Sequence, residues 1–224
     1  MCGRFALNQS PAELVRVFGL LECAGFGPRF NIAPGTDIPA VRRSPEGNRL
    51  LHLLRWGLVP HWARDVAIGA RLNNARGESV TQKPAFREAF RQRRCLIPAS
   101  GFYEWKTVAK AKQPYYFSLP GGAPMALAGL WEAWRAPDGA VLHSCCILTT
   151  AANDTLAPIH DRMPLIIPAA AWSLWLDGPA DEAQQLVIPF AAGTLQHWPV
   201  SRRVNRAATD DAALTEALEA FAAP

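Results

Sequence analysis

The chain begins Met-Cys-Gly-Arg-Phe, which places a cysteine directly behind Met1. Removal of Met1 would leave Cys2 with a free α-amine and a thiol on adjacent carbons, and such a 1,2-aminothiol condenses selectively with aldehydes. An α-amine has a pKa of about 8, so a useful fraction of it is neutral at pH 7, whereas most lysine amines are protonated there. The first residues therefore indicate a nucleophile for carbonyl chemistry.

Two further stretches carry groups that could move protons. In "GFYEWK", Glu104 stands among aromatic residues, and a carboxyl group in such surroundings is expected to be partly desolvated, with a raised pKa suited to proton transfer. In "PIHDRMP", His160 stands in a Pro-bounded loop, and histidine is well matched to acid–base work near neutrality. Taken alone, each stretch is equally compatible with a solvent-facing side chain.

Two more stretches could bind rather than react. In "LNNARGES", Asn74, Arg76 and Glu78 alternate, so on a strand they would share one face, although a turn built on Asn-Asn and Gly explains the pattern as well. In "WGLVPHW", Trp56 and Trp62 flank a Pro-containing loop. An indole exposed on such a loop can stack on or wedge between bases, although packing in the core is the usual fate of tryptophan.

The elements that must position these side chains are mostly strands joined by short loops. A helix is expected over residues 10–19, because Ser10 can cap it, Pro11 suits its first turn and Gly19 can close it. Further helices are expected over 168–178 and, at the C-terminus, about 209–222. Without regular strand–helix alternation, the order favours an α+β protein: a single domain over 1–224 with a barrel-like mixed or antiparallel sheet and peripheral helices.

Composition narrows the function classes. The chain has 224 residues, of which 50% are hydrophobic and 19% charged, so a sizeable core is expected. No apolar run is long enough to span a membrane and no secretory signal is evident, so a cytoplasmic location is expected. The net charge is +4, and 19 of the 23 basic residues are arginine, which suits but does not require a nucleic-acid partner. The five cysteines form no Cys-x-x-Cys pair, so no metal is expected.

In order, these blocks resemble the SOS-response-associated peptidase (SRAP) family. The resemblance runs from residue 2 to about 206, through MCGRF, FNIAPGT, WGLVPHW, NNARGE, GFYEW, TTA, IHDRMPLII and VN. It implies a mixed α/β domain with a barrel-like sheet that captures abasic sites in single-stranded DNA as a covalent crosslink. It also implies a reaction that needs no cofactor, and it assigns roles to particular residues. The implied catalytic residues are Cys2, Asn74, Glu104 and His160, and the implied DNA-binding residues are Gly3, Arg4, Trp62, Arg76, Thr149 and Arg162.

The resemblance further implies how the reaction would run. The amine of Cys2 would form an imine with the sugar aldehyde, and the thiol would close it to a thiazolidine. Met1 would first be removed, either by the same site or by an aminopeptidase. The protein is expected to act as a monomer, associated with the bacterial nucleoid when bound to DNA. Two alternatives stay open: an N-terminal-cysteine protease or amidase that acts in trans, and a non-catalytic module that binds single-stranded DNA.

Overall fold

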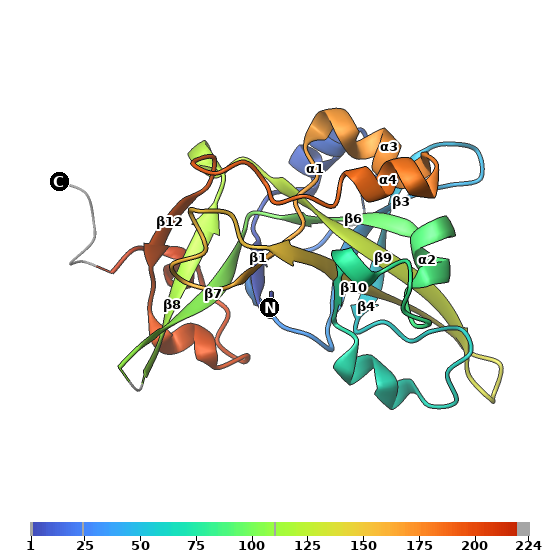
Figure 1. Ribbon diagram of the computed structural model, residues 1–224, viewed down its shortest axis with the longest axis horizontal. Coiled ribbons are helices and arrows are strands. Elements are labelled where there is room, and N and C mark those ends of the chain that lie inside the picture. The colour runs from blue at the N-terminus through green and yellow to red at the C-terminus, as the bar shows by residue number, and fades with distance from the viewer. Residues whose placement is uncertain (1, 24, 110, 219–224) are drawn as a thin grey trace.

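The computed structural model of the protein describes residues 2–23, 25–109 and 111–218, and it contains two β-sheets with short helices around them (Figure 1). One sheet has the strand order β12-β8-β7-β1-β2, and the other has the order β11-β10-β4-β3-β6-β9, with β5 beside β10. The strands are β1 (Phe5–Leu7), β2 (Arg29–Ile32), β3 (Asp37–Arg43), β4 (Arg49–Trp56), β5 (Asn74–Arg76), β6 (Arg94–Ala99), β7 (Gly101–Val108), β8 (Ala111–Ser118), β9 (Met125–Arg135), β10 (Val141–Ala151), β11 (Arg162–Pro164) and β12 (Gln196–Pro199).

The larger sheet closes on itself into a five-stranded barrel, because β9 pairs with both β6 and β10. A closed ring with an odd number of strands cannot be antiparallel throughout, and the required parallel pair is β10–β4, in the register Ser144↔Arg55 and Cys145↔Trp56. Beyond Trp56 the strand β5 continues along the same edge of β10, with Ile147 opposite Asn74. The predicted α+β class with a barrel-like sheet is therefore confirmed.

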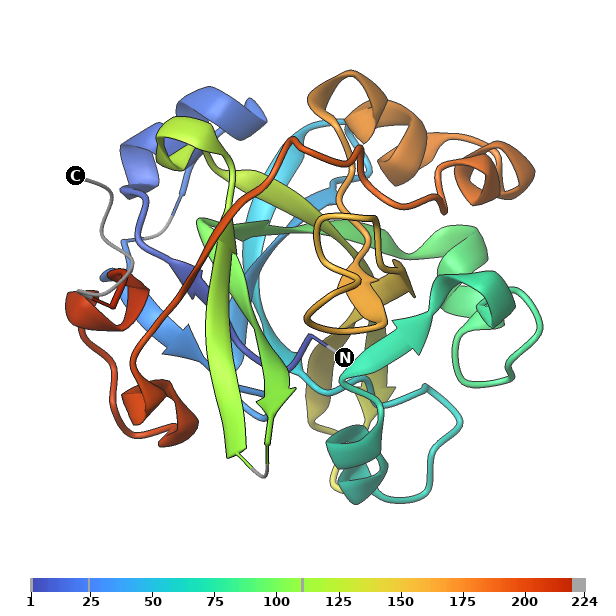
Figure 2. The ribbon, with the colours of Figure 1, turned by 60° about the vertical axis from the view of Figure 1, so that its left-hand side comes forward.

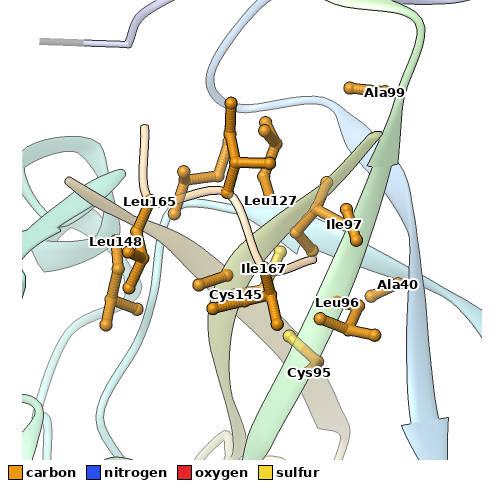
Figure 3. Packing of buried hydrophobic residues seen from close by; sticks show 14 of the residues in the cluster. Ala40, Cys95, Leu96, Ile97, Ala99, Leu127, Cys145, Leu148, Leu165 and Ile167 are labelled. Atoms are coloured by element: carbon orange, nitrogen blue, oxygen red, sulfur yellow. The ribbon is translucent and has the colours of Figure 1, made fainter. Parts of the chain in front are cut away.

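The main core fills this barrel and the space under the helices. Figure 3 shows side chains from four barrel strands and from the segment after β11 meeting there. The labelled residues are Ala40, Cys95, Leu96, Ile97, Ala99, Leu127, Cys145, Leu148, Leu165 and Ile167. A second, smaller cluster on the other face of the five-stranded sheet joins Tyr103 and Tyr116 to Val200, Val204 and Leu214. The segment after β12 thus covers this sheet.

The helices are α1 (Pro11–Phe18), α2 (Arg87–Gln92), α3 (Trp172–Asp177) and α4 (Ala180–Gln185). The N-terminal helix forms as predicted: Ser10 Oγ accepts a hydrogen bond from the Glu13 backbone N–H, and Gly19 ends the helix at φ +63°. The helix expected over 168–178 is split into a 3-10 turn over Ala169–Ala171 and then α3. None of the described helices is long and apolar enough to cross a membrane.

The helix predicted over about 209–222 does not form in its described part. Residues Ala212–Thr215 make one 3-10 turn, Glu216 is extended, and the Leu218 N–H donates to the carbonyl of Pro199. Tertiary hydrogen bonds occupy backbone groups that a helix would use. The side chain of Asn31, for example, donates to the carbonyl of Thr209. Residues 219–222 of this prediction lie outside the described part of the chain.

Candidate active site

Cys2 lies where the amino-terminal segment runs into β1, between β7 and β5. The segment is tied on one side by the hydrogen bond from the Tyr103 N–H to the carbonyl of Arg4. On the other side, Nδ2 of Asn74 donates to the carbonyl of Cys2 at 2.8 Å. The Cys2 side chain is wholly buried, and burial raises the pKa of its thiol far above the ordinary value, with the nearby charge of Glu104 adding to the effect. The thiol is therefore protonated at neutral pH.

Glu104 supplies a carboxyl group beside this cysteine. It stands in β7 opposite Tyr115 of β8, and only 1% of it is exposed. Burial, which penalises the charged form, raises the pKa of Glu104 to about 7. The carboxyl group is thus balanced between its protonated and ionised forms near neutrality, as the aromatic surroundings in the sequence predicted.

His160 faces Glu104 from the loop before β11, with 3.9 Å between its Nε2 and Oε2 of Glu104. The backbone N–H of Arg162 lies 2.9 Å from Nδ1 and suits the neutral ring, whereas Oδ1 of Asp161 lies 3.1 Å from Nδ1 and suits the protonated ring. The pKa of His160 is lowered, mainly by burial. Because both protonation states have partners, this ring can give and take a proton without moving.

Glu104 and His160 border one cleft of about 390 Å³, which is lined by Arg4, Glu104, Trp105, Lys112, His160 and Asn205. The Arg4 guanidinium is held in place by hydrogen bonds of 2.8 Å to Oδ1 of Asn31 and to the carbonyl of Val204. Two cationic side chains therefore flank a carboxyl–imidazole pair, and an anionic backbone could lie along this wall.

Arg162 and Thr149 contact each other but do not line the cleft. The guanidinium of Arg162 makes a two-pronged ion pair with Glu78 at 2.7 and 2.8 Å and also donates to the carbonyl of Thr149 at 2.7 Å. Thr149 itself is wholly buried. In this structure Thr149 therefore supports Arg162 and β5, and it does not face the cleft directly.

The remaining sequence candidates lie apart from the carboxyl–imidazole pair. Trp62 is 51% exposed and borders a second hollow, together with Arg64 and Arg71. Arg76 is exposed at the end of β5, and Gly3 is half-buried between the cysteine and Arg4. The structure thus brings Cys2, Asn74, Glu104 and His160 together, whereas Trp62, Arg76 and Gly3 do not line the cleft.

The sequence reasoning missed several residues of the cleft. Trp105 follows Glu104 in "GFYEWK", and its Nε1 donates to Oδ1 of Asn205 at 2.8 Å. Asn205 could have been identified from the VN block of the resemblance. Lys112 had no signal in the sequence, because it reaches the cleft only through the pairing of β8 with β7. No group of three or more His, Cys, Asp or Glu side chains in the described ranges is arranged to hold a metal ion.

Fold and site together define a class: small-barrel α+β proteins whose amino-terminal cysteine lies beside a buried carboxyl group that faces an imidazole. The family model described as "SOS response associated peptidase (SRAP)" matches residues 1–207. The chain belongs to this family.

Relatives of known name agree with this assignment. The chain is 39% identical to the "Abasic site processing protein YoaM" of Bacillus subtilis over 224 residues, which cover 97% of this chain and 98% of the relative. It is 28% identical to the "Abasic site processing protein HMCES" of Xenopus tropicalis, covering 92% of this chain and 75% of the relative.

Among solved structures, a protein from Bacteroides thetaiotaomicron has the same fold, with a TM-score of 0.87 at 21% identity and coverage of 97% of this chain and 100% of that chain. A phage-related protein from Bordetella bronchiseptica matches with a TM-score of 0.72 at 30% identity, covering 90% of this chain and 95% of that chain.

Proposed function

We propose that this protein traps abasic sites in single-stranded DNA as a covalent thiazolidine through Cys2, once Met1 has been removed. The observation that carries the proposal is the placement of Cys2 beside Glu104, whose buried carboxyl group faces His160 in a cleft bordered by Arg4 and Lys112. The names of the Bacillus and Xenopus relatives point to the same substrate. DNA damage handling is therefore the function that site and family support together.

The chemistry follows from the groups present. An abasic sugar interconverts between a cyclic hemiacetal and an open aldehyde, and His160 is placed to move the proton that opens the ring. The α-amine of Cys2 adds to C1′, and loss of one water gives an imine. The thiol then adds to the imine carbon, its proton passes to the nitrogen, and a five-membered thiazolidine closes. The closed ring no longer draws electrons from C2′, so strand breakage by β-elimination is suppressed.

Glu104 is the group best suited to carry the protons of these steps. Because burial keeps the Cys2 thiol protonated, ring closure needs a nearby acceptor, and loss of water needs a nearby acid. A carboxyl group with a pKa of about 7 serves both roles at neutral pH. Asn74 fixes the cysteine by holding its carbonyl.

Formation of the aminothiol requires hydrolysis of the Met1–Cys2 peptide bond, which consumes one water and releases methionine. Met1 lies outside the described residues. We assign the cleavage either to the same site, with the Cys2 thiol as nucleophile and Glu104 or His160 as proton carrier, or to an aminopeptidase. Mass spectrometry of wild-type protein and of the Glu104→Gln and His160→Gln variants distinguishes the two, because an aminopeptidase would process all three equally.

The DNA would lie across the cleft and its rim. Arg4, Arg76 and Arg162 contact phosphates in this proposal, which makes the affinity depend on salt concentration, and the half-exposed indole of Trp62 fills the space that the missing base leaves. Gly3 allows the strand to approach Cys2, and Thr149 acts by holding Arg162. The protein works as one domain and as a monomer in the cytoplasm.

The decisive experiment incubates the processed protein with a single-stranded oligonucleotide that contains one abasic site, followed by a denaturing gel. We expect a shifted band with wild-type protein, and none with Cys2→Ala or with an intact oligonucleotide. An undiminished band with Cys2→Ala would refute the proposal. Cys2-dependent cleavage of peptides without any DNA adduct would favour the protease alternative, and DNA binding without any adduct would favour the binding module.

A further inference from the structure

His61, the neighbour of Trp62, belongs to an ionic network that the proposed chemistry does not use. The hydrogen bond from the Ala63 N–H to the carbonyl of Pro60 closes a β-turn with His61 and Trp62 at its centre. The imidazole points away to the protein body: its Nδ1 lies 3.5 Å from Oε1 of Glu132.

A second carboxylate and an arginine complete the network. Nε2 of His61 lies 3.7 Å from Oε2 of Glu88, on α2. Arg93 lies between the two carboxylates, with Nη2 2.9 Å from Oε1 of Glu132 and 3.4 Å from Oε1 of Glu88. Glu132, on β9, is only 3% exposed, and a buried carboxylate has to keep its partners. The network is therefore a fixed support for the imidazole.

Trp62, by contrast, has no hydrogen bond or ring contact with any residue in the described part of the chain, and half of it is exposed. The turn sets where this side chain leaves the backbone. That turn is held before it by the Val59 N–H, which donates to Oγ of Ser144 at 2.8 Å, and after it by Nε1 of Trp134, which donates to the carbonyl of Ala63 at 2.7 Å. Between these two anchors, the His61 side chain joins the turn to Glu132 and Glu88.

We propose that His61 is a positioning residue: it holds the turn in the conformation that directs the Trp62 indole toward the space left by the missing base. This inference rests on the role given to Trp62 in the proposed function. An indole already fixed by the turn loses less conformational entropy when it meets the DNA than one on a free loop. The ring of His61 suits this task because it offers one nitrogen to each carboxylate.

The first test needs no DNA. In protein labelled with 5-fluorotryptophan, the fluorine resonance that disappears in Trp62→Phe belongs to Trp62, one of eight tryptophans. We expect His61→Ala to move this resonance towards its position in unfolded protein. His61→Arg should restore it, since a guanidinium can reach both carboxylates. Glu88→Gln should give a smaller shift, and Glu182→Gln, a matched change in the first turn of α4, should give none. An unmoved resonance in His61→Ala overturns the proposal.

The second test measures discrimination between strands. For each variant, the rate of adduct formation on the abasic oligonucleotide is divided by the affinity for the intact oligonucleotide. Removing the two partly exposed contacts of His61 with carboxylates should lower this ratio about fivefold in His61→Ala, and the double variant His61→Ala/Trp62→Ala should be no worse than Trp62→Ala alone. Additive losses would overturn the proposal. If the fluorine signal moves as expected but Trp62→Ala leaves the ratio unchanged, it is the proposed role of Trp62 that fails.

Discussion

Replacing Glu104 with glutamine should make the protein more stable and less active at the same time. The carboxyl group is 1% exposed, and burial raises its pKa from 4.5 to about 7. The folded state therefore binds this proton more tightly than the unfolded state, so the free energy of unfolding falls as the pH rises from about 5 to about 8. A shift of this size corresponds to about 3 kcal/mol.

Glutamine has a similar shape but does not ionise, so the variant escapes this penalty. At pH 5 the two proteins should be about equally stable, because Glu104 is then neutral as well. At pH 8 the variant should be more stable by up to about 3 kcal/mol, less whatever the carboxylate gains from its neighbours. Meanwhile adduct formation should slow by about 10²- to 10⁴-fold, as is typical when a positioned acid–base group is lost.

Urea unfolding at pH 5, 6.5 and 8 and single-turnover adduct formation at the same pH values measure both effects. Glu132→Gln is the control, because Glu132 is equally buried but pairs with Arg93, so its loss should destabilise the protein at every pH. A Glu104→Gln variant that is less stable than wild type at pH 8 would refute the burial argument. A more stable variant that still reacts at the wild-type rate would refute the catalytic role.

Three further predictions follow from single contacts. Asn74→Ala removes the donor to the carbonyl of Cys2 and should slow adduct formation by about tenfold or more, measured by quenched gels; an unchanged rate would exclude the positioning role. Arg76→Ala should leave stability unchanged but reduce the slope of log affinity against log salt for single-stranded DNA by about 0.7, measured by fluorescence anisotropy. Gly101→Ala would place a Cβ 2.4 Å from a backbone oxygen and should lower the free energy of unfolding by about 3 kcal/mol in urea titrations, whereas Gly25→Ala, which meets nothing within 4 Å, should be neutral.

Predictions from neighbouring residues were good where local chemistry decides the outcome. The helix after Ser10 was predicted with its correct N-cap residue. The signals are the Ser10 hydroxyl, the proline of the first turn and the glycine at the end, and all of them act within that helix. The raised pKa of Glu104 was expected, and burial is its main cause. The C-terminal helix was wrong in its described part, because hydrogen bonds from Asn31 and to Pro199 outweigh helix propensity there.

The residues of the candidate site likewise fall into those that the sequence predicted and those that depend on strand pairing. Cys2, Glu104 and His160 could be chosen from the sequence, because an aminothiol, a desolvated carboxyl group and a loop histidine are recognisable by residue type and immediate neighbours. Lys112 and the His61–Glu132 contact could not, since they depend on which strand lies next to which. In Figure 2 the amino-terminal segment, the β7–β8 hairpin, β5 and the loop before β11 lie near one another, although they are far apart in the sequence.

By itself, the sequence determined the candidate reactive groups, the mixed class of the fold and the helix next to the amino terminus. Only the tertiary structure decided that the barrel closes through a parallel β10–β4 pair, and that β5 then takes over the edge of β10 and carries Asn74 to the carbonyl of Cys2. The reason is physical: residue types and short periodicities report local geometry, whereas strand pairing over long separations is set by which arrangement buries the whole core at once.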